Sequence, residues 1–257
     1  MKREMNYVVK DQVATLTLAR PKQLNALTSN LLEELADALE EANQDEEVRV
    51  IVLTGEGRGF CAGQDLKTVS PELDHGEYLQ QYYHPVVRAL AKSKKPTIAA
   101  INGVAAGAGL SLTLACDFRL VHAEAKLSLG FINIGLVPDA GAPYFLPRLI
   151  GAAKATELAL LGDTISAEEA VSLNLATRRI EADRFDEEVT LFAQSLANRP
   201  TKVIGYIKQL QAASYENNLE EMLAQEIIYQ SRAGKTEDHR HAVESFIEKK
   251  RPVFVGR

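Results

Sequence analysis

The sequence predicts an α/β fold in which pairs of short strands alternate with helices, followed by a helical C-terminal part. Three observations support this prediction. Short, largely apolar runs rich in β-branched residues recur along the first two thirds of the 257 residues, as expected of buried strands. Stretches with apolar residues at helical spacing lie between these runs. From about Ala182 onward, only the helical spacing remains.

The N-terminal elements are a predicted hairpin and an amphipathic helix. Residues 6–9 and 13–19 are β-branched runs separated by the polar tripeptide KDQ, which indicates two strands joined by a turn. Ser29 then precedes LLEELADALEEA, where leucines recur every three or four residues and glutamates fill the other side. This pattern predicts a helix whose leucine face lies on the core.

The middle of the chain repeats the order strand, strand, helix without sequence identity. Two runs, RVIVLT and PTIAAI, have the composition of fully buried strands, and a glycine-rich turn follows each of them. The expected elements are strands over 49–54, 96–101, 118–121 and 126–129, and helices over about 77–92, from the second glycine turn to about Asp117, and from Tyr144 onward.

The last third of the chain is predicted to be helical. Apolar faces occur in DEEVTLFAQSLA, VIGYIKQLQAA and LEEMLAQEIIYQ, and a final helix is expected over about 241–250. We therefore divide the chain into residues 1–181, a core of strand-strand-helix units, and residues 182–257, a helical region that packs on another subunit.

Composition and charge argue against several classes of protein. The net charge is −6, and no long acidic or basic block occurs, so nucleic acid is not an expected partner. Two cysteines are too few for a disulfide framework or a four-ligand zinc site, and they fit a reducing cytoplasm. Residues 1–6 form no apolar leader, and runs such as 97–101 are too short to span a bilayer. We expect a cytoplasmic protein.

Two glycine-rich turns, GRGFCAGQDL at 57–66 and NGVAAGAGLS at 102–111, are candidates for chemistry. Glycine turns let main-chain N–H groups approach a ligand closely, but they also serve tight turns and close helix packing, so both roles stay open. A dinucleotide-binding fingerprint does not fit, because Leu112 stands where its third glycine belongs. Neither turn ends in the Gly-Lys-Ser/Thr of a phosphate-binding loop.

Histidine and cysteine offer weaker candidates. The five histidines are scattered, and His239 and His241 would face different directions on one helix, so we expect no metal site. His75 and His84 lie in a polar stretch and are expected to face solvent. Cys61 lies in the first glycine turn without a basic partner nearby in sequence, which favours a packed thiol over a nucleophile.

Asp139 places one carboxylate inside the otherwise apolar stretch NIGLVPDAGAPYF. Two interpretations remain open. A Pro-Asp pair before small residues is typical of a helix start, where the carboxylate caps the helix. Alternatively, the flanking Ile134, Leu136 and Val137 desolvate the carboxylate and raise its proton affinity toward that of a general base.

The motifs RPKQLNAL, GRGFCAGQDL, NGVAAGAG and GLVPDAGA, in this order and spacing, together with LLGDTISAEEAVSLNLA downstream, resemble the crotonase, or enoyl-CoA hydratase/isomerase, superfamily over nearly the whole chain. The resemblance implies a crotonase-like α/β spiral of ββα units with a helical C-terminal trimerisation region. It also implies an acyl-CoA thioester as substrate, self-association as a homotrimer or a dimer of trimers, and no separate cofactor, since coenzyme A is part of the substrate.

The resemblance also implies roles for individual residues, most of which lie within 1–181, the part expected to carry the coenzyme A site and the active site. The main-chain N–H groups of Gln64 and Ala108 form an oxyanion hole for the thioester, and such donors favour the enolate. Phe246 and Lys249 reach coenzyme A from the same or a neighbouring subunit. The remaining wall around coenzyme A consists of Asn25, Ala26, Ala62, Asp65, Leu66 and Lys67.

The departures from the family pattern point to the reaction. Two glutamates activate water in the hydratases, and their positions hold Ser111 and Phe131 here, so we expect hydration to be weak or absent. Asp139 stands where several isomerases keep their acid/base, and one carboxylate suffices to move one proton. The apolar residues expected around the acyl group are Phe60, Phe131, Leu136, Tyr144 and Phe145.

Within the superfamily, GRGFCAGQDL and YYHPVVRALAKSKKPTIAAINGVAAGAGLSL look closest to the isomerases of bacterial phenylacetate degradation. These isomerases convert ring-1,2-epoxyphenylacetyl-CoA to its oxepin form and shift double bonds. Residues 68–83 are expected to set substrate preference. The alternatives are an enoyl-CoA hydratase of broad specificity, a dehalogenase or hydrolase with Asp139 as nucleophile, and an RNA-binding homologue, against which the acidic charge balance argues.

Overall fold

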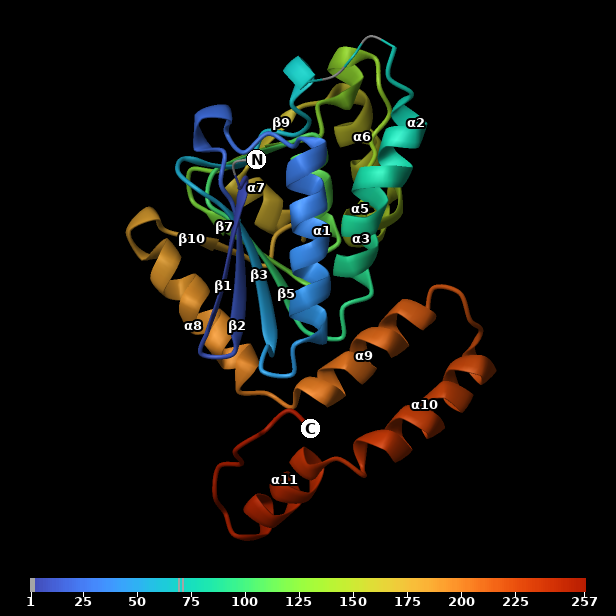
Figure 1. The fold of residues 1–257 in the computed structure, drawn as a ribbon. Helices are drawn as coiled ribbons and strands as arrows, with labels where there is room; N and C mark the ends of the chain where they lie inside the picture. The colour runs from blue at the N-terminus through green and yellow to red at the C-terminus, as the bar shows by residue number, and fades with distance from the viewer. Residues whose placement is uncertain (1–2, 69, 71) are drawn as a thin grey trace.

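The computed structural model describes residues 3–68, 70 and 72–257. Residues 1 and 2 of the polar N-terminus lie outside the described residues, as do residues 69 and 71 of the segment 68–83. Figure 1 shows two parts: strands with their covering helices above, and an arm of three helices that projects below.

The larger sheet of the described chain has six strands in the order β1-β2-β3-β5-β7-β10. The first two strands form the predicted antiparallel hairpin, and the other neighbours pair in parallel. All five residues of the central β5 are buried, as parallel strands covered on both faces require. The bounds are β1 Met5–Lys10, β2 Val13–Leu18, β3 Val50–Gly55, β5 Thr97–Ile101, β7 Phe118–His122 and β10 Arg178–Ile180.

The smaller sheet has four strands in the order β4-β6-β8-β9, with bounds β4 Gly59–Cys61, β6 Val104–Ala106, β8 Lys126–Ser128 and β9 Thr164–Ser166. Each of β3, β5 and β7 in the larger sheet is followed along the chain by a strand of this sheet, which confirms the predicted spiral of ββα units. The sequence analysis placed β4 and β6 inside glycine-rich loops. It missed them because these three-residue strands are stabilised by their neighbours and carry little strand propensity of their own.

The helices of the core largely follow the predicted pattern. Helix α1 (Ser29–Gln44) buries its leucine face, but Thr28 caps it in place of Ser29 by accepting a hydrogen bond from the N–H of Leu31. The helix predicted over 77–92 is three segments: α2 (His75–Tyr78), a π-helical turn (Leu79–Tyr83) and α3 (His84–Ala91). The remaining core helices are α4 Ala108–Leu114, α5 Ala142–Ile150, α6 Ala152–Leu161 and α7 Ala167–Ser172.

The C-terminal third is helical, as predicted. Helix α8 (Phe185–Ala197) packs on the larger sheet, where Phe185 and Ala193 join the strand residue Val52 in one apolar cluster. Helices α9 (Thr201–Ala213), α10 (Leu219–Ala233) and α11 (Glu237–Ile247) form the projecting arm. The last helix thus begins four residues before the predicted start at 241 and ends before 250. A boundary at 181 stays a prediction, although α8 packs with the core.

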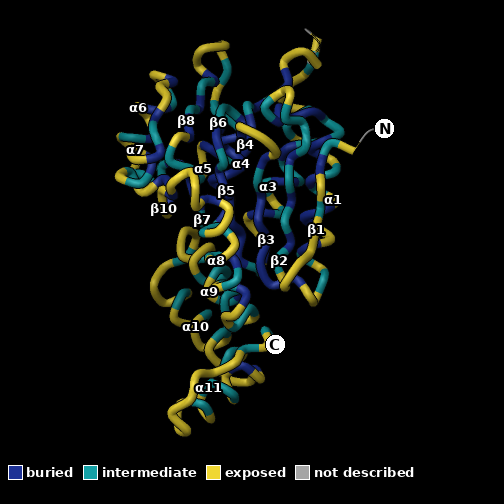
Figure 2. Tube along the Cα trace, turned by 90° about the vertical axis from the view of Figure 1, so that its left-hand side faces the viewer, coloured by how far each residue is buried: buried dark blue, intermediate teal, exposed yellow. Residues whose placement is uncertain are grey.

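The arm is tied to the core at both of its ends, near Thr201 and near Phe254. Arg49, at the start of β3, is 5% exposed and donates to the carbonyl of Phe254 at 2.8 Å, to the Thr201 hydroxyl at 2.8 Å and to the carbonyl of Arg199. Figure 2 shows the contrast between the buried strands and the largely exposed arm. In the described part of the chain, no helix combines the length and apolarity that crossing a bilayer demands.

Candidate active site

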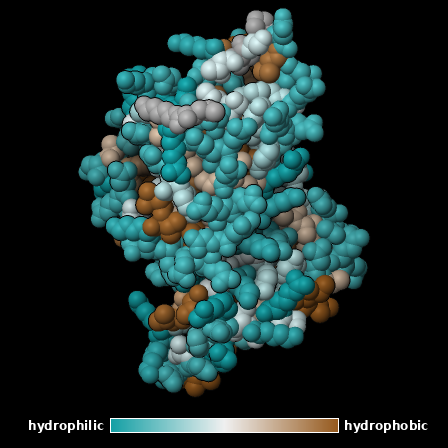
Figure 3. Space-filling view, viewed as in Figure 1, coloured by the Kyte–Doolittle hydropathy of each residue, from teal (hydrophilic) through white to brown (hydrophobic). Residues whose placement is uncertain are grey.

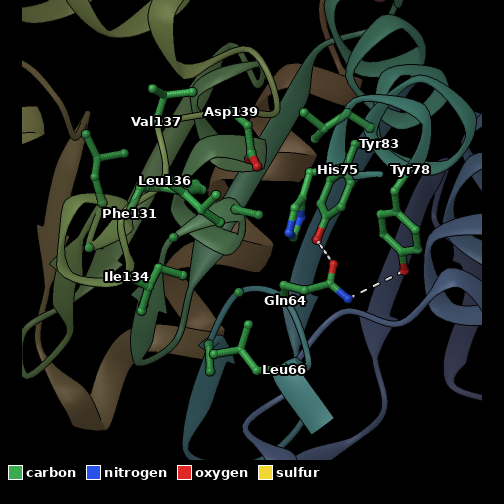
Figure 4. Close-up of a pocket in the computed structure, with 18 of the residues that line it drawn as sticks. Gln64, Leu66, His75, Tyr78, Tyr83, Phe131, Ile134, Leu136, Val137 and Asp139 are labelled. Atoms are coloured by element: carbon green, nitrogen blue, oxygen red, sulfur yellow. Dashed lines mark hydrogen bonds between the residues drawn. The ribbon is translucent and has the colours of Figure 1, made fainter. Parts of the chain in front are cut away.

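Both glycine-rich turns and the segment with Asp139 meet at one cavity of ≈ 250 Å³. Figure 4 shows Asp139 across this space from Gln64, with the side chains of His75 and Tyr83 between them. The lining residues are Ala62, Gly63, Gln64, Leu66, Leu73, His75, Tyr78, Leu79, Tyr83, Ala106, Gly107, Ala108, Leu129, Gly130, Phe131, Ile134, Leu136, Val137 and Asp139.

The two turns approach each other so closely that Gly63 must be glycine. Its φ is +91°, and a Cβ there would lie 2.9 Å from the carbonyl oxygen of Ala106 and 3.6 Å from the nitrogen of Ala108. A side chain would therefore separate the two turns. The close approach brings the main chain after β4 next to the first residue of α4.

The main-chain N–H groups of Gln64 and Ala108 are both available at this junction. Ala108 begins α4, and the hydrogen bonds of this helix start later, with Ser111 N–H donating to Gly107 at 3.0 Å. On the other turn, Leu27 pairs with the carbonyl of Gly63 and the N–H of Asp65. Because peptide groups alternate along an extended chain, the N–H of Gln64 points away from Leu27. Two such donors can stabilise a developing oxyanion.

Asp139 does not cap a helix. The N-cap of α5 is Gly141, with φ of +86°, and no side chain of the described residues caps this helix. Only the Asp139 carbonyl contributes there, by accepting from the N–H of Ala142 at 2.9 Å. The Oδ1 atom of Asp139 is buried without a hydrogen-bond partner in the described chain, and Figure 4 shows the carboxylate directed into the cavity. The helix-cap interpretation is therefore wrong.

The surroundings of Asp139 change its proton affinity. Burial raises the pKa of this carboxyl from 3.8 to about 6, because an apolar environment disfavours the charged form. Leu136 and Val137 precede it in the chain and line the same cavity. A carboxyl with this pKa can both accept and return a proton near neutral pH.

The cavity is also lined by His75, Tyr78 and Tyr83. They belong to the segment 68–83, which was expected to set substrate preference, but none of them was named as a site residue. The sequence analysis assigned His75 to solvent, and the residue is exposed overall, but Figure 4 shows its imidazole directed toward the cavity. Tyr83 donates a hydrogen bond to Oε1 of Gln64 at 2.5 Å. The cluster of aromatic residues in LQQYYHP was the available signal, but helical spacing alone does not indicate which tyrosine faces inward.

Two of the five apolar residues expected around an acyl group, Phe131 and Leu136, line the cavity. Phe60 does not, since it is 0% exposed inside the core. Tyr144 lies on the surface with Arg148 3.7 Å above its ring, and Phe145 packs against the core. These three expectations are wrong because the sequence does not show which face of each element meets the cavity.

Of the residues expected to bind coenzyme A, some line the cavity, some are buried near it, and two lie on the arm. Ala62 and Leu66 line the cavity, and Lys67 is exposed beside Leu66. Ala26 is 8% exposed, close to the buried turn that contains Asn25. Phe246 and Lys249 belong to the distant arm and do not line this cavity in the same chain.

The side chains of Asn25 and Asp65 form hydrogen bonds inside the protein, next to the first glycine-rich turn. The Asn25 side chain is 0% exposed and donates to the carbonyls of Glu56 at 3.0 Å and Gly59 at 2.8 Å. Asp65 accepts from the guanidinium of Arg20 at 2.9 Å. Both polar groups are thus engaged inside the protein, so their side chains do not form the expected wall around a ligand.

Ser111 and Cys61 are both buried inside the core. Ser111 is 0% exposed, and its hydroxyl donates to the Gly107 carbonyl at 3.2 Å. Cys61 is buried, and burial raises the pKa of its thiol to about 12. A thiol that stays protonated is a poor nucleophile, which agrees with the predicted packing role.

The chain is similar to known proteins over nearly its whole length. The model of the enoyl-CoA hydratase/isomerase family matches residues 9–257. The chain is 40% identical over 254 residues to 1,2-epoxyphenylacetyl-CoA isomerase of Escherichia coli (strain K12), with 97% of each chain covered. It is 38% identical over 212 residues to 4-chlorobenzoyl coenzyme A dehalogenase-2 of Arthrobacter sp, covering 80% of this chain and 77% of that one.

A solved structure agrees as well. The fold is similar to the crystal structure of a putative enoyl-CoA hydratase from Streptomyces coelicolor A3(2), with a TM-score of 0.94 and 38% identity. The alignment covers 99% of this chain and 95% of that chain. The likeness therefore includes the two sheets and the C-terminal helices alike.

Proposed function

Since the chain belongs to the enoyl-CoA hydratase/isomerase family, we propose that it is an acyl-CoA isomerase that moves a C=C bond by transferring one proton through Asp139. One observation carries this proposal: the buried, unpartnered Oδ1 of Asp139 faces the cavity that two available main-chain N–H groups also border. A base and an oxyanion site on opposite sides of one cavity suit proton removal next to a thioester.

The reaction follows from this placement. The thioester oxygen of a 3-enoyl-CoA lies between the N–H groups of Gln64 and Ala108. The carboxylate of Asp139 removes a proton from C2, and the electrons move into an enolate whose oxygen the two N–H groups stabilise. The carboxyl then returns the proton to C4, which leaves the double bond between C2 and C3. One group serves as base and acid in turn, so its pKa of about 6 suits both steps.

Hydration is disfavoured by the same cavity. Asp139 is the only carboxylate among the described residues that line it. The hydroxyl of Ser111 is occupied by Gly107, and Phe131 presents an apolar ring. Water addition that needs a paired acid and base would lack one partner, and such a group contributes about 10²- to 10⁴-fold in rate.

The cavity wall also supports an aromatic acyl group. Tyr78, Tyr83 and Phe131 contribute rings, and aliphatic side chains form most of the remaining wall. We therefore include ring-1,2-epoxyphenylacetyl-CoA among the substrates, with its oxepin form as the product, because the Escherichia coli relative is named 1,2-epoxyphenylacetyl-CoA isomerase. With this substrate, the reaction belongs to phenylacetate catabolism. We place it in the cytoplasm, since both cysteines are free.

A second candidate uses the same carboxylate as a nucleophile. In this reaction, Oδ1 of Asp139 attacks the ring carbon of 4-chlorobenzoyl-CoA that carries chlorine, the C–Cl bond breaks, and chloride leaves as an aryl ester forms on Asp139. The 38% identity to a 4-chlorobenzoyl coenzyme A dehalogenase supports this candidate. The two reactions differ in their intermediates. Rapid quenching with 4-chlorobenzoyl-CoA followed by peptide mass spectrometry would detect an aryl adduct on Asp139 if the nucleophilic reaction occurs, and an unmodified peptide if it does not.

The test of the isomerase is an activity panel with 3-enoyl-CoA, crotonyl-CoA and the epoxide of phenylacetyl-CoA, followed by ultraviolet absorbance and mass. We expect wild-type protein to isomerise 3-enoyl-CoA and Asp139→Asn to lose about 10²- to 10⁴-fold of this rate. Asp163→Asn, at an exposed position away from the cavity, is the matched control. Full activity of Asp139→Asn, or hydration of crotonyl-CoA as fast as isomerisation, would contradict the proposal.

We further propose that the arm joins chains into a homotrimer or a dimer of trimers. Figure 3 shows apolar side chains on the lower part of the molecule, where the arm lies, and a surface of this kind marks contact sites. Light scattering should give three or six times the mass of one chain. Ile227→Glu, on α10, should lower this mass, whereas Val8→Glu, on β1, should not. The exposed large apolar residues on helices α9, α10 and α11 are Ile207, Leu219, Leu223, Ile227, Ile228, Val243, Phe246 and Ile247.

A further inference from the structure

The side chain of Gln64 is held by two tyrosines at the edge of the cavity. Tyr83 donates to Oε1 of Gln64 at 2.5 Å, and Nε2 of Gln64 reaches the Tyr78 hydroxyl at 3.5 Å. Figure 4 shows both interactions, with the amide lying between the two phenol groups. The same residue supplies one of the two main-chain N–H groups assigned to the oxyanion hole. The hydrogen bonds of the Gln64 side chain therefore affect the position of a group that would contact the thioester oxygen.

The π-helical turn brings the two tyrosines onto one face. In an α-helix, residues five apart project about 140° away from each other. Here the N–H of His84 donates to the carbonyl of Leu79, five residues back, which widens the turn. The rings of Tyr78 and Tyr83 consequently lie 6.0 Å apart, and both line the cavity. Tyr82, between them in sequence, does not line it.

The hydroxyl of Tyr83 donates a hydrogen bond and stays protonated. It is 2% exposed, and burial, with the nearby charge of Asp139, raises the pKa of its hydroxyl far above the usual value. A phenol has one proton to donate, and this one is engaged by Gln64. Tyr83 is therefore a fixed donor that orients the amide, and it does not compete with Asp139 for the substrate proton.

On the side of Leu27, main-chain hydrogen bonds hold the turn that carries Gln64: the Leu27 N–H donates to the Gly63 carbonyl at 2.8 Å, and the Leu27 carbonyl accepts from the Asp65 N–H at 2.9 Å. The Gly63 carbonyl and the Gln64 N–H belong to one peptide group, so this pairing sets the direction of the N–H. On the cavity side, the side-chain bonds to Tyr83 and Tyr78 hold Gln64, and their loss would let this peptide group tilt relative to the thioester oxygen. The benefit of an oxyanion hole depends on donors that are held in place before the charge develops.

We propose that Tyr83, assisted by Tyr78, is a positioning residue that holds Gln64 so that its main-chain N–H faces the thioester oxygen. The inference rests on the proposed function for its effect on turnover, but its effect on a bound carbonyl requires no turnover. Tyr83→Phe keeps the ring and removes only the donor. It should lower the kcat for 3-enoyl-CoA isomerisation by about 10- to 100-fold and change KM less than about threefold, because misplacing a transition-state contact acts on the chemical step.

A bound conjugated thioester reports on the donors directly. Hydrogen bonds to its carbonyl move its ultraviolet band to longer wavelength, so 2,4-hexadienoyl-CoA bound to wild-type protein should show this shift. Tyr83→Phe should reduce the shift by at least half. Gln64→Leu should do the same, and the double variant should fall no further than either single one. Tyr82→Phe is the matched control and should match wild type in both the shift and kcat.

The outcomes separate this inference from the proposed function. An unchanged band and an unchanged kcat in Tyr83→Phe would overturn the positioning role, even while Asp139→Asn loses activity. A reduced band shift in Tyr83→Phe would support it, even if wild-type protein proves unable to isomerise 3-enoyl-CoA. A purely structural role predicts a lower thermal midpoint with a wild-type band, and this result would also refute the inference.

Discussion

Asp139→Asn should stabilise the folded chain at pH 8 while it removes proton transfer. Burial raises the pKa of Asp139 from 3.8 to about 6, so the folded state binds this proton more tightly than the unfolded state does. Stability from this source is present below pH 4 and is lost as the pH rises through 6. Each pKa unit corresponds to about 1.4 kcal/mol, so the ionised carboxylate costs about 3 kcal/mol at pH 8.

The assay is urea unfolding at pH 4, 6 and 8 at one protein concentration. Circular dichroism is the suitable signal, because the chain has no tryptophan. The stability of Asp139→Asn minus that of wild type should grow by between about 2 and about 3 kcal/mol from pH 4 to pH 8. This pH-dependent difference is more informative than either absolute value, since the new amide changes local contacts equally at each pH.

Asp163→Asn serves as the control for removal of a surface charge. Its position is exposed, so its stability should stay within about 0.5 kcal/mol of wild type at every pH. If the difference for Asp139→Asn is flat between pH 4 and pH 8, the carboxylate is not desolvated. The explanation of its catalytic role by burial would then be refuted, whatever happens to the rate.

Further predictions concern the base, the turns, the thiols and the arm. The kcat/KM for 3-enoyl-CoA should rise with pH to a plateau, with a midpoint near 6 in a rate profile. Gly63→Ala should lose at least about 100-fold in kcat because its Cβ would lie 2.9 Å from a carbonyl, whereas Gly151→Ala, with a similar φ but no described atom within 4 Å, should keep its kcat. Cys61 should resist iodoacetamide at pH 8 in the folded protein and react after unfolding, as peptide mass spectrometry can show. Arg49→Met should lower the free energy of unfolding by about 2 to 4 kcal/mol and speed proteolysis of the C-terminal residues, since three acceptors lose their donor.

Much of the fold followed from local patterns. The hairpin, the strand over 97–101 and the leucine face of α1 were predicted within one or two residues. Their signals lie in neighbouring residues, as strand composition and helical spacing do. The strands β4 and β6 were not predicted, because three residues with glycine and alanine form a strand only when partners far along the chain pair with them.

The candidate site shows the same division. Local sequence singled out both glycine turns and the unusual carboxylate of Asp139, and the family motifs assigned their roles. The sequence left open whether Asp139 caps a helix, and it assigned Phe60 and Tyr144 to a pocket that they do not reach. It did not indicate that a π-helical turn would place Tyr78 and Tyr83 on Gln64.

The sequence by itself determined which residues could do chemistry here, because residue type and turn formation are local properties. Only the tertiary structure decided which of them meet. Segments around Gln64, Ala108 and Asp139 are separated by dozens of residues, and the spiral brings them to one cavity. The proton affinity of Asp139 has the same origin, since exclusion of water from a carboxylate requires side chains from several distant elements at once.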